Sequence, residues 1–373
     1  MKTVYTHSIE LTGTHYEAGY RLGAQIASVP QLKECYTAGF PGFGPDEAKK
    51  AAALFSMWCP GINEELEGAA DALGTSPRNL IYCAMTWLHP GCSHMALLPS
   101  MTESGHPLVA RSYEFNDTLE DFNVIRTSIQ GAYTHIGTGI CGLGRDDGVN
   151  EMGLAVTMSS SGFPVGADKN MRGPAIIGLQ YWAVIRTLLD TCRDVNECLD
   201  RLKDMPIAYN MNLILTDKSG HAVLYETLDG RKAYQSIDPS TAEQYLYAAN
   251  HPLLDGLIPF EPMAMDNSLR RCESMKAFLE QKKGGYTTDD LKKMLLTPYP
   301  AGLSCPYYTD FFGTTKSMVI DPAAGTLDLC WGGREENGWL HFSVDGTFKE
   351  ETRVITLVNQ PADPSIFQFR SRP

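Results

Sequence analysis

The sequence has no excess of basic residues and no long apolar run. Its 31 Lys and Arg against 44 Asp and Glu give a formal net charge of -13, whereas nucleic acids and anionic membrane surfaces are bound by clustered basic side chains. No apolar stretch approaches the roughly 20 residues that cross a bilayer, and residues 1–15 lack the apolar segment of a secretory signal. We therefore expect no nucleic-acid partner, no membrane partner and a cytoplasmic location.

Motifs for metals and organic cofactors are also missing. The ten cysteines are spread from Cys35 to Cys330, which is unlike the close spacing of a disulfide scaffold. Cys192 and Cys198 lie in one predominantly helical stretch with no second pair nearby, so structural zinc is not expected. The glycine pattern at 137–142 is not followed by a helix that could hold a dinucleotide, and we interpret it as a hairpin or loop. The sequence predicts no metal and no cofactor.

The pattern of the sequence changes at Cys92. Before it, residues 1–91 are predicted to be helical, with a capping box at Thr14-His-Tyr-Glu17 and a Pro45 that suits a first helical position. After it, short strand-like runs alternate with two pairs of helices. This order predicts an α+β fold in which helices cover two stacked sheets, a four-layer αββα sandwich over residues 92–373 preceded by a helical segment over 1–91.

The predicted elements after Cys92 can be given as ranges. The helices are expected at 175–190, 195–202, 268–281 and 288–296, and the strands at 95–98, 107–111, 123–129, 154–158, 211–215, 222–226, 244–249, 317–320, 326–331 and 339–342. Before Cys92, helices are expected up to residue 27 and at 46–59, 62–73 and 78–88.

Cys92 stands directly after a helix-ending His89-Pro90-Gly91 and before a predicted strand. Because Gly91 has no Cβ, the thiol of Cys92 can reach the preceding carbonyl, and an N-to-S acyl shift followed by hydrolysis would release Cys92 as a new amino terminus. An α-amine has an unperturbed pKa of about 7.7 to 8.0, so it could accept the thiol proton near neutral pH. Taken alone, Cys92 is more simply interpreted as a buried structural thiol.

Several segments around Cys92 carry a resemblance. They are Gly91-Cys92-Ser93, Gly105-His-Pro-Leu-Val-Ala-Arg111, Asn150-Glu-Met-Gly-Leu-Ala-Val-Thr157, Asn250-His251 and, earlier, Gly13-Thr-His-Tyr-Glu-Ala-Gly19 with Gly23. In order and spacing they resemble the penicillin acyltransferase family (acyl-CoA:6-aminopenicillanic acid acyltransferase, peptidase C45-like) and, more loosely, bile salt (choloylglycine) hydrolases. The resemblance implies the N-terminal nucleophile hydrolase fold and makes Cys92 the nucleophile.

The resemblance also implies a supporting shell. Arg111 matches the arginine beside the nucleophile, where its charge would favour the thiolate; the alternative is a surface arginine at a strand end. Glu114 stands where the family usually has an Asp that hydrogen-bonds the new α-amine. The extra methylene of Glu114 puts this geometry in question, and Asp117 is the fallback.

Three further residues match family positions. Asn150 and Asn250 correspond to two asparagines around the reacting carbonyl, where an amide NH2 can stabilise an oxyanion by roughly 3 to 4 kcal/mol. Asn150 suits a turn equally well. Arg271 lies where bile salt hydrolases have an active-site arginine, although a place on a helix surface is at least as plausible.

These residues predict a self-processing cysteine amidase or acyltransferase that acts on a small-molecule N-acyl amide through an acyl-Cys92 intermediate. One alternative is a Cys-His hydrolase that uses His251 or His94 as base and does not cleave itself. Another is a catalytically silent binding protein on the same fold. The aromatic candidates for the substrate pocket are Tyr113, Phe115, Phe163, Trp182 and Tyr308.

Overall fold

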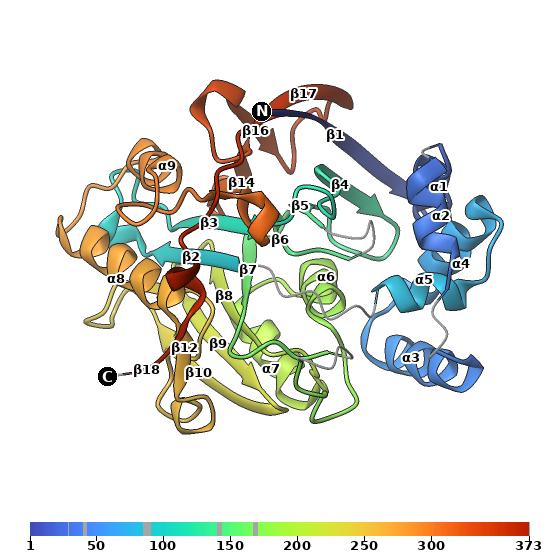
Figure 1. The fold of residues 1–373 in the computed structure, drawn as a ribbon, viewed down its shortest axis with the longest axis horizontal. Helices are drawn as coiled ribbons and strands as arrows, with labels where there is room; N and C mark the ends of the chain where they lie inside the picture. The colour runs from blue at the N-terminus through green and yellow to red at the C-terminus, as the bar shows by residue number, and fades with distance from the viewer. Residues whose placement is uncertain (29, 40–42, 85–90, 140–143, 167–170, 373) are drawn as a thin grey trace.

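Two β-sheets stack face to face at the centre of the molecule, as Figure 1 shows. The computed structural model describes residues 1–28, 30–39, 43–84, 91–139, 144–166 and 171–372. Most neighbouring strands in each sheet are antiparallel and are joined by short loops, as in a fold assembled from hairpins.

The larger sheet has nine strands, and one pair among them is parallel. β1 runs parallel to β4, whereas the other neighbours are antiparallel. In spatial order the strands are β10 (Arg231–Ile237), β9 (Ala222–Leu228), β8 (Met211–Asp217), β7 (Leu154–Ser160), β6 (Asp147–Asn150), β5 (His135–Thr138), β4 (Asn123–Ile129), β1 (Lys2–Gly13) and β17 (Glu351–Leu357).

The smaller sheet has seven strands, all antiparallel to their neighbours. Its order is β11 (Tyr245–Ala248), β2 (Gly91–Leu97), β3 (Leu108–Phe115), β14 (Phe312–Asp321), β15 (Thr326–Trp331) and β16 (Trp339–Ser343), with β13 (Pro306–Tyr307) beside β14. A separate two-stranded pair joins β12 (Met263–Met265) to β18 (Phe369–Ser371).

Helices cover the outer face of each sheet. On the nine-stranded sheet, α6 (Tyr181–Thr191) and α7 (Val195–Asp204) share a buried apolar cluster with β7 and β8. On the seven-stranded sheet, α8 (Asp266–Glu280) and α9 (Thr288–Leu296) share another with β2 and β3. A third cluster fills the space between the sheets. The predicted four-layer αββα sandwich is confirmed.

Alternation along the strands explains why these layers form. In β7, Leu154, Val156 and Met158 belong to the helix-facing cluster, and Ala155 belongs to the cluster between the sheets. A strand buried on both faces needs apolar or internally bonded residues at every position. The structure differs from the prediction at α6, which begins at Tyr181 and not near residue 175.

The prediction that residues 1–91 are entirely helical is wrong at their start. β1 is a twelve-residue strand that lies between β4 and β17 inside the nine-stranded sheet. Buried and more exposed residues alternate along its middle: Thr6 and Ser8 are buried, whereas Tyr5 is exposed and His7 is half-buried. Two of the five buried positions are hydroxyl residues, and Ser8 and Ile9 are buried in succession, so the apolar residues of β1 do not show a period of two.

The four helices predicted after β1 are present as α1 (His15–Ala27), α3 (Pro45–Trp58), α4 (Ile62–Leu73) and α5 (Pro77–Ala84). A further helix, α2 (Pro30–Thr37), was not among the predicted ranges. The Thr14–Glu17 capping box is confirmed at the start of α1. Gly19 permits the close packing of α1 on α4, because a Cβ there would lie 2.0 Å from the carbonyl oxygen of Glu65. The predicted end of the last helix, at 85–90, lies outside the described residues.

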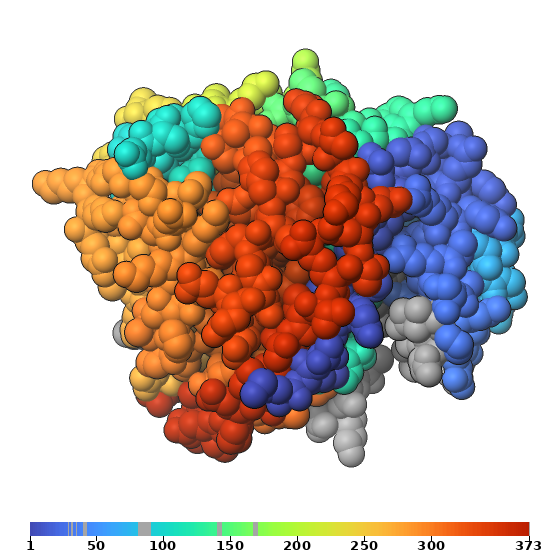
Figure 2. Space-filling view, turned by 90° about the horizontal axis from the view of Figure 1, so that it is seen from above, coloured from blue at the N-terminus to red at the C-terminus, as the bar shows by residue number. Residues whose placement is uncertain are grey.

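The N-terminal helices form one end of the molecule, seen in blue in both Figure 1 and Figure 2. In Figure 2 the start of the chain lies beside the red C-terminal region, in agreement with the pairing of β1 with β17. Among the described residues, no helix combines the length and apolar character needed to cross a lipid bilayer.

Candidate active site

Cys92 is the second residue of β2, which lies between β11 and β3. It is buried, faces Tyr113 across the ladder and belongs to an apolar cluster that includes Tyr181 and Tyr209. Successive side chains of a strand point to opposite faces. Since Ala96 faces the other sheet, the thiol of Cys92 points between the sheets, and only its backbone is open to groups on the side of α8.

The backbone of Cys92 is held from that side by two predicted residues. Its N–H donates to the side-chain oxygen of Asn250 at 3.0 Å, and its carbonyl oxygen accepts from Nη1 of Arg271 at 2.5 Å. Nη2 of Arg271 also donates to the same oxygen of Asn250, at 2.6 Å. The strand start, the loop after β11 and helix α8 therefore meet at one residue.

Arg271 is buried and does not lie on a helix surface. It points from α8 toward β2, where Nη1 also donates to Oγ of Ser93 at 3.0 Å. Nη2 donates to Oδ1 of Asn267, one helical turn earlier, at 2.8 Å. The guanidinium lies 4.9 Å from the ring centroid of Phe312. The structure thus brings Arg271 to Cys92 as the resemblance implied.

The side-chain amide of Asn250 is fixed on its nitrogen side by Ser160 at the end of β7. Nδ2 donates to the carbonyl oxygen of Ser160 at 2.9 Å and to its Oγ at 3.0 Å. The backbone N–H of Asn250 donates to Oγ of Ser268 at 2.8 Å. In this uncleaved chain the oxygen of Asn250 faces Cys92 and the NH2 group faces Ser160.

Arg111 lies on β3 in the space between the sheets, on the same side as the thiol. Its Nε donates to Oδ2 of Asp147 at 2.9 Å, Nη1 donates to the carbonyl oxygen of Met158, and Nη2 has no hydrogen-bond partner. Burial raises the pKa of the Cys92 thiol to about 12, and the charge of Arg111 is the strongest influence that opposes this rise. The thiol is therefore protonated at neutral pH, and a base is required to make it a nucleophile.

Behind Arg111 lies a buried ion network that the sequence did not predict. Nζ of Lys316 lies 2.8 Å from Oδ2 of Asp146, 3.3 Å from Oε1 of Glu120 and 4.2 Å from the ring centroid of Tyr113. Buried charges are stable only when paired. The sequence signal was the pair Asp146 and Asp147, which resembled ordinary loop residues.

Glu114 lies on the opposite face of β3 from Arg111, toward α8. It accepts from Oγ of Ser112 and, at 3.3 Å, from Oγ1 of Thr314, and its Oε2 is 3.6 Å from Nη1 of Arg271. Burial raises the pKa of its carboxyl, and Arg271 opposes this. Glu114 pairs with Gly91 across the ladder, so it lies beside the Gly91–Cys92 bond. In this chain the Cys92 N–H contacts Asn250 and not Glu114.

The fallback Asp117 is not in the site. Its carboxylate forms an ion pair with Lys2 at 2.6 Å, in which the lysine side chain is half exposed. A residue with this partner at the molecular surface cannot replace Glu114 beside Cys92.

The prediction that Asn150 surrounds the reacting carbonyl is wrong. Its Nδ2 donates to the carbonyl oxygens of Leu189 and Cys192 at 2.9 and 2.8 Å, and its Oδ1 accepts from the backbone of Met152 and Leu154. This turn precedes β7, whereas Ser160 and its partner Asn250 lie at the far end of that strand. At about 3.4 Å per residue, the length of β7 separates Asn150 from the site by roughly 20 Å.

Neither His94 nor His251, the two candidate bases of a Cys-His hydrolase, is placed to act on Cys92. Nδ1 of His94 lies 2.9 Å from Oγ1 of Thr157, and Nδ1 of His251 lies 2.7 Å from Oγ of Ser268. Burial lowers the pKa of His251 to about 3 and that of His94 well below its ordinary value. The geometry therefore does not favour a Cys-His pair.

Of the aromatic candidates for a substrate pocket, three share the buried cluster of Cys92: Tyr113, Phe115 and Trp182. Tyr308 belongs to the cluster between the sheets, and Phe163 packs on Phe369 with ring centroids 5.5 Å apart. Sequence reasoning missed Tyr181 and Tyr209, which contact each other in the Cys92 cluster with centroids 4.8 Å apart.

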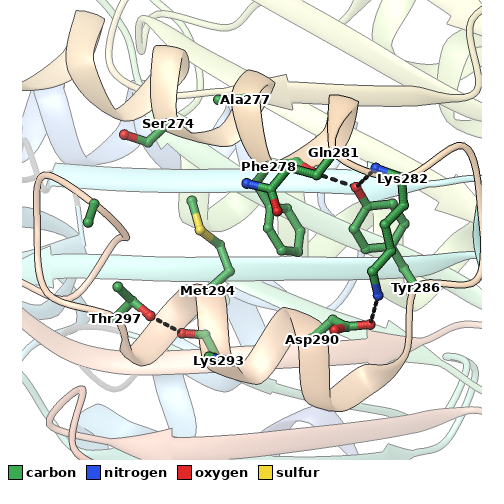
Figure 3. Close-up of a pocket in the computed structure, with 11 residues that line it drawn as sticks. Ser274, Ala277, Phe278, Gln281, Lys282, Tyr286, Asp290, Lys293, Met294 and Thr297 are labelled. Carbon is green, nitrogen blue, oxygen red and sulfur yellow. Dashed lines mark hydrogen bonds and ion pairs between the residues drawn. The ribbon is translucent and has the colours of Figure 1, made fainter.

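A separate groove of about 400 Å³ opens between α8 and α9 (Figure 3), and it holds none of the predicted site residues. Two of its charged groups pair, since Nζ of Lys282 lies 2.7 Å from Oδ2 of Asp290. Within the part of the chain that the structure describes, no group of three His, Cys, Asp or Glu could hold a metal ion.

The chain is similar to known proteins in sequence and in fold. A family model described as acyl-coenzyme A:6-aminopenicillanic acid acyl-transferase matches residues 100–336, a segment that begins after Cys92 and contains Arg111, Glu114, Asn250 and Arg271. Among curated proteins, none matches the sequence significantly.

Several solved structures are similar to this chain, including these three. A mutant conjugated bile acid hydrolase from Clostridium perfringens has 13% identity and a TM-score of 0.47, covering 73% of this chain and 99% of that chain. Penicillin V acylase from Agrobacterium tumefaciens has 17% identity and a TM-score of 0.41, and the match covers 64% of this chain and 83% of that chain. The N-acylethanolamine-hydrolyzing acid amidase ortholog from Caenorhabditis elegans has 11% identity and a TM-score of 0.44, and the match covers 62% of this chain and 93% of that chain.

Proposed function

The chain belongs to the acyl-coenzyme A:6-aminopenicillanic acid acyl-transferase family, and on that basis we propose that it is a self-processing cysteine amidase or acyltransferase with Cys92 as nucleophile. The observation that carries this proposal is the convergence of Asn250 and Arg271 on the backbone N–H and C=O of Cys92. A structural thiol does not require its own peptide groups to be held by a buried arginine and an amide from two distant elements.

Self-cleavage is the first step. The sulfur of Cys92 attacks the carbonyl carbon of Gly91, the C–N bond breaks, and the thiol proton ends on the nitrogen of Cys92. Water then hydrolyses the thioester, which leaves Gly91 with a carboxylate and Cys92 with a thiol and a free amine. The products are residues 1–91 and 92–373. The absence of a Cβ at Gly91 supports this step, because a side chain there would meet Phe312 and Glu114.

Acyl transfer follows on the processed protein. In the uncleaved chain, burial raises the pKa of the Cys92 thiol to about 12. After cleavage the thiol gives its proton to the new α-amine of the same residue. The thiolate attacks the acyl carbon of an N-acyl amide, and the leaving amine takes the proton from the ammonium. Water or a second amine then attacks the acyl-thioester, and its proton passes to the α-amine as the thiolate leaves and is reprotonated.

Named residues support the charged states of this cycle. Arg111 lies on the thiol side and favours the thiolate. Asn250 and Arg271 hold the amine side, where Glu114 lies near Arg271 and would contact the ammonium after Gly91 leaves. The buried aromatic residues Tyr181 and Tyr209 suit an apolar acyl group.

Intact mass and a substrate panel test the proposal. The wild-type chain is expected to yield two polypeptides that break before Cys92, and Cys92→Ala is expected to yield one. The processed protein should release amine from a panel of penicillins, conjugated bile acids and N-acyl amino acids. Full amidase activity in Cys92→Ala would overturn the assignment. Activity without cleavage would favour the Cys-His alternative, and cleavage without turnover of any substrate would favour the silent binding protein.

A further inference from the structure

The loop that carries Asn250 is anchored to the opposite sheet through its flanking carbonyl groups. The carbonyl oxygen of Ala249 accepts from Nδ2 of Asn212 at 2.9 Å and also from Oγ of Ser159. The carbonyl oxygen of His251 accepts from the same Nδ2 of Asn212 at 3.1 Å. One amide nitrogen therefore bridges the peptide groups on either side of Asn250.

Asn212 is well placed to do this because of its strand and face. It lies on β8 directly opposite Ser159 of β7, and its neighbour two residues on, Ile214, belongs to the cluster between the sheets. Asn212 is completely buried. The two strands thus present a pair of donors across the inter-sheet space to the chain that follows β11.

The other half of the Asn212 amide is unsatisfied. Its Oδ1 has no hydrogen-bond partner, although it is buried. A buried unpaired carbonyl oxygen destabilises the folded state, and an apolar residue of the same size would avoid that loss. The stability of the sheet therefore does not explain why this position holds an asparagine. The hydrogen bonds from its Nδ2 to the carbonyl oxygens of Ala249 and His251 do explain it.

We propose that Asn212 is the positioning residue that sets the orientation of Asn250 toward the backbone of Cys92. This inference rests on the proposed function, in which the Cys92 backbone is the site of self-cleavage. Asn212 touches neither Cys92 nor the reacting bond. By fixing the peptides of Ala249 and His251, it fixes the Cα of Asn250 and the reach of its side chain to Cys92 and Ser160.

The test uses Asn212→Leu in the full chain, with Thr216→Val as matched control. Thr216 lies on the same strand and face, is buried, and has an unpartnered hydroxyl, so the control repeats the polar-to-apolar change away from the loop. We expect Asn212→Leu to slow cleavage before Cys92 at least tenfold and, once processed, to lower kcat with little change in KM. Thr216→Val should cleave at the wild-type rate.

A second comparison separates positioning from general stability. In an Asn250→Ala background, Asn212→Leu should add little further slowing, because the residue that it positions is already absent. If Asn212→Leu does not fold, Ser159→Ala tests the same anchor through Ala249 and should slow cleavage more than Thr216→Val does. Wild-type cleavage rates in folded Asn212→Leu, or equal slowing with and without Asn250, would overturn the inference. A wild-type chain that neither cleaves nor turns over any substrate would overturn the proposed function itself.

Discussion

The side-chain oxygen of Asn250 accepts a 3.0 Å hydrogen bond from the backbone N–H of Cys92, 158 residues earlier in the chain. The contact joins the start of β2 to the loop after β11, and these two strands are neighbours in the seven-stranded sheet. The nitrogen of Cys92 is the atom that self-cleavage would convert into an amine. In the proposed reaction, Asn250 therefore contacts the nitrogen of the scissile bond before that bond breaks.

Removing this contact should slow self-cleavage. For Asn250→Ala we expect a rate of cleavage before Cys92 reduced by roughly 100-fold, the scale of losing one preorganised polar group at a reacting carbonyl. A time course of intact mass measures it. Ser160→Ala is the matched control, because it removes the 3.0 Å contact to Nδ2 and leaves the 2.9 Å contact to the Ser160 carbonyl; its rate should fall much less. Equal rates for all three chains would contradict the prediction.

A side chain at position 91 should disturb the scissile bond. A Cβ added to Gly91 would lie 2.5 Å from Cε2 of Phe312 and 3.0 Å from Cβ of Glu114. For Gly91→Ala we expect slower cleavage and a loss of about 1–3 kcal/mol in the free energy of unfolding, as for other overpacked sites. Both effects should shrink in a Phe312→Ala background, where the ring is absent. Cleavage kinetics and denaturant unfolding of the four chains test this, and an undiminished effect in that background would show that the ring is not the cause.

The sequence predicted the layers of the fold because most of its strands and helices carry their own signals. β4 was predicted with its observed bounds, 123–129, and the capping box at Thr14 marks the start of α1. β1 could not be predicted in this way, because its buried positions include Thr6 and Ser8. Such a strand is recognisable only once both of its partners, β4 and β17, are known.

The site was predicted in part for a similar reason. Cys92, Arg111 and Arg271 were identified from local motifs, and the fold brings them together. Asn150 was misplaced, because a turn asparagine and an oxyanion asparagine look the same in sequence. Lys316 was missed, because a single lysine just before the predicted strand 317–320 gives no sign that it lies across from Asp146, the residue that precedes β6.

Asn150 should therefore affect stability and not catalysis. It is buried and makes four hydrogen bonds to backbone groups. Asn150→Ala leaves those groups unpaired, and we expect a loss of about 2–4 kcal/mol in the free energy of unfolding. Cleavage and turnover per folded molecule should match the wild type at a temperature where the variant is folded. A kcat reduced a hundredfold in folded Asn150→Ala would restore a catalytic role.

The fragment 1–91 should stay bound after cleavage. β1 is paired on both edges within the nine-stranded sheet, and Glu65 of α4 forms a buried ion pair with Arg186 of α6 at 2.6 Å. Both fragments should co-elute on size-exclusion chromatography without denaturant. Glu65→Ala leaves Arg186 with one fewer partner and should destabilise the complex by about 3–5 kcal/mol. Arg21→Ala, at the half-exposed pair with Glu350, should cost less than about 1 kcal/mol. Elution of a free 1–91 fragment would contradict this prediction.

Glu226 should make stability fall as pH rises from about 4.5 to about 7. Its carboxyl oxygens accept from the backbone N–H groups of Leu253 and Leu254 at 2.7 and 3.0 Å, yet burial is the largest influence and raises the pKa from 4.5 to about 7. The folded state then binds a proton that the unfolded chain has already lost in this range, so the free energy of unfolding decreases with pH.

The matching variant is Glu226→Gln, which cannot ionise. Its stability should lack this slope, so the stability of the wild type relative to the variant should decline by up to about 3 kcal/mol between pH 4.5 and pH 7. Below pH 4.5 both forms are neutral at this position in the folded and unfolded states, and the difference between them should be constant. Urea unfolding at several pH values measures it. A difference that does not change with pH would mean that Glu226 ionises as readily in the folded protein as in the unfolded chain.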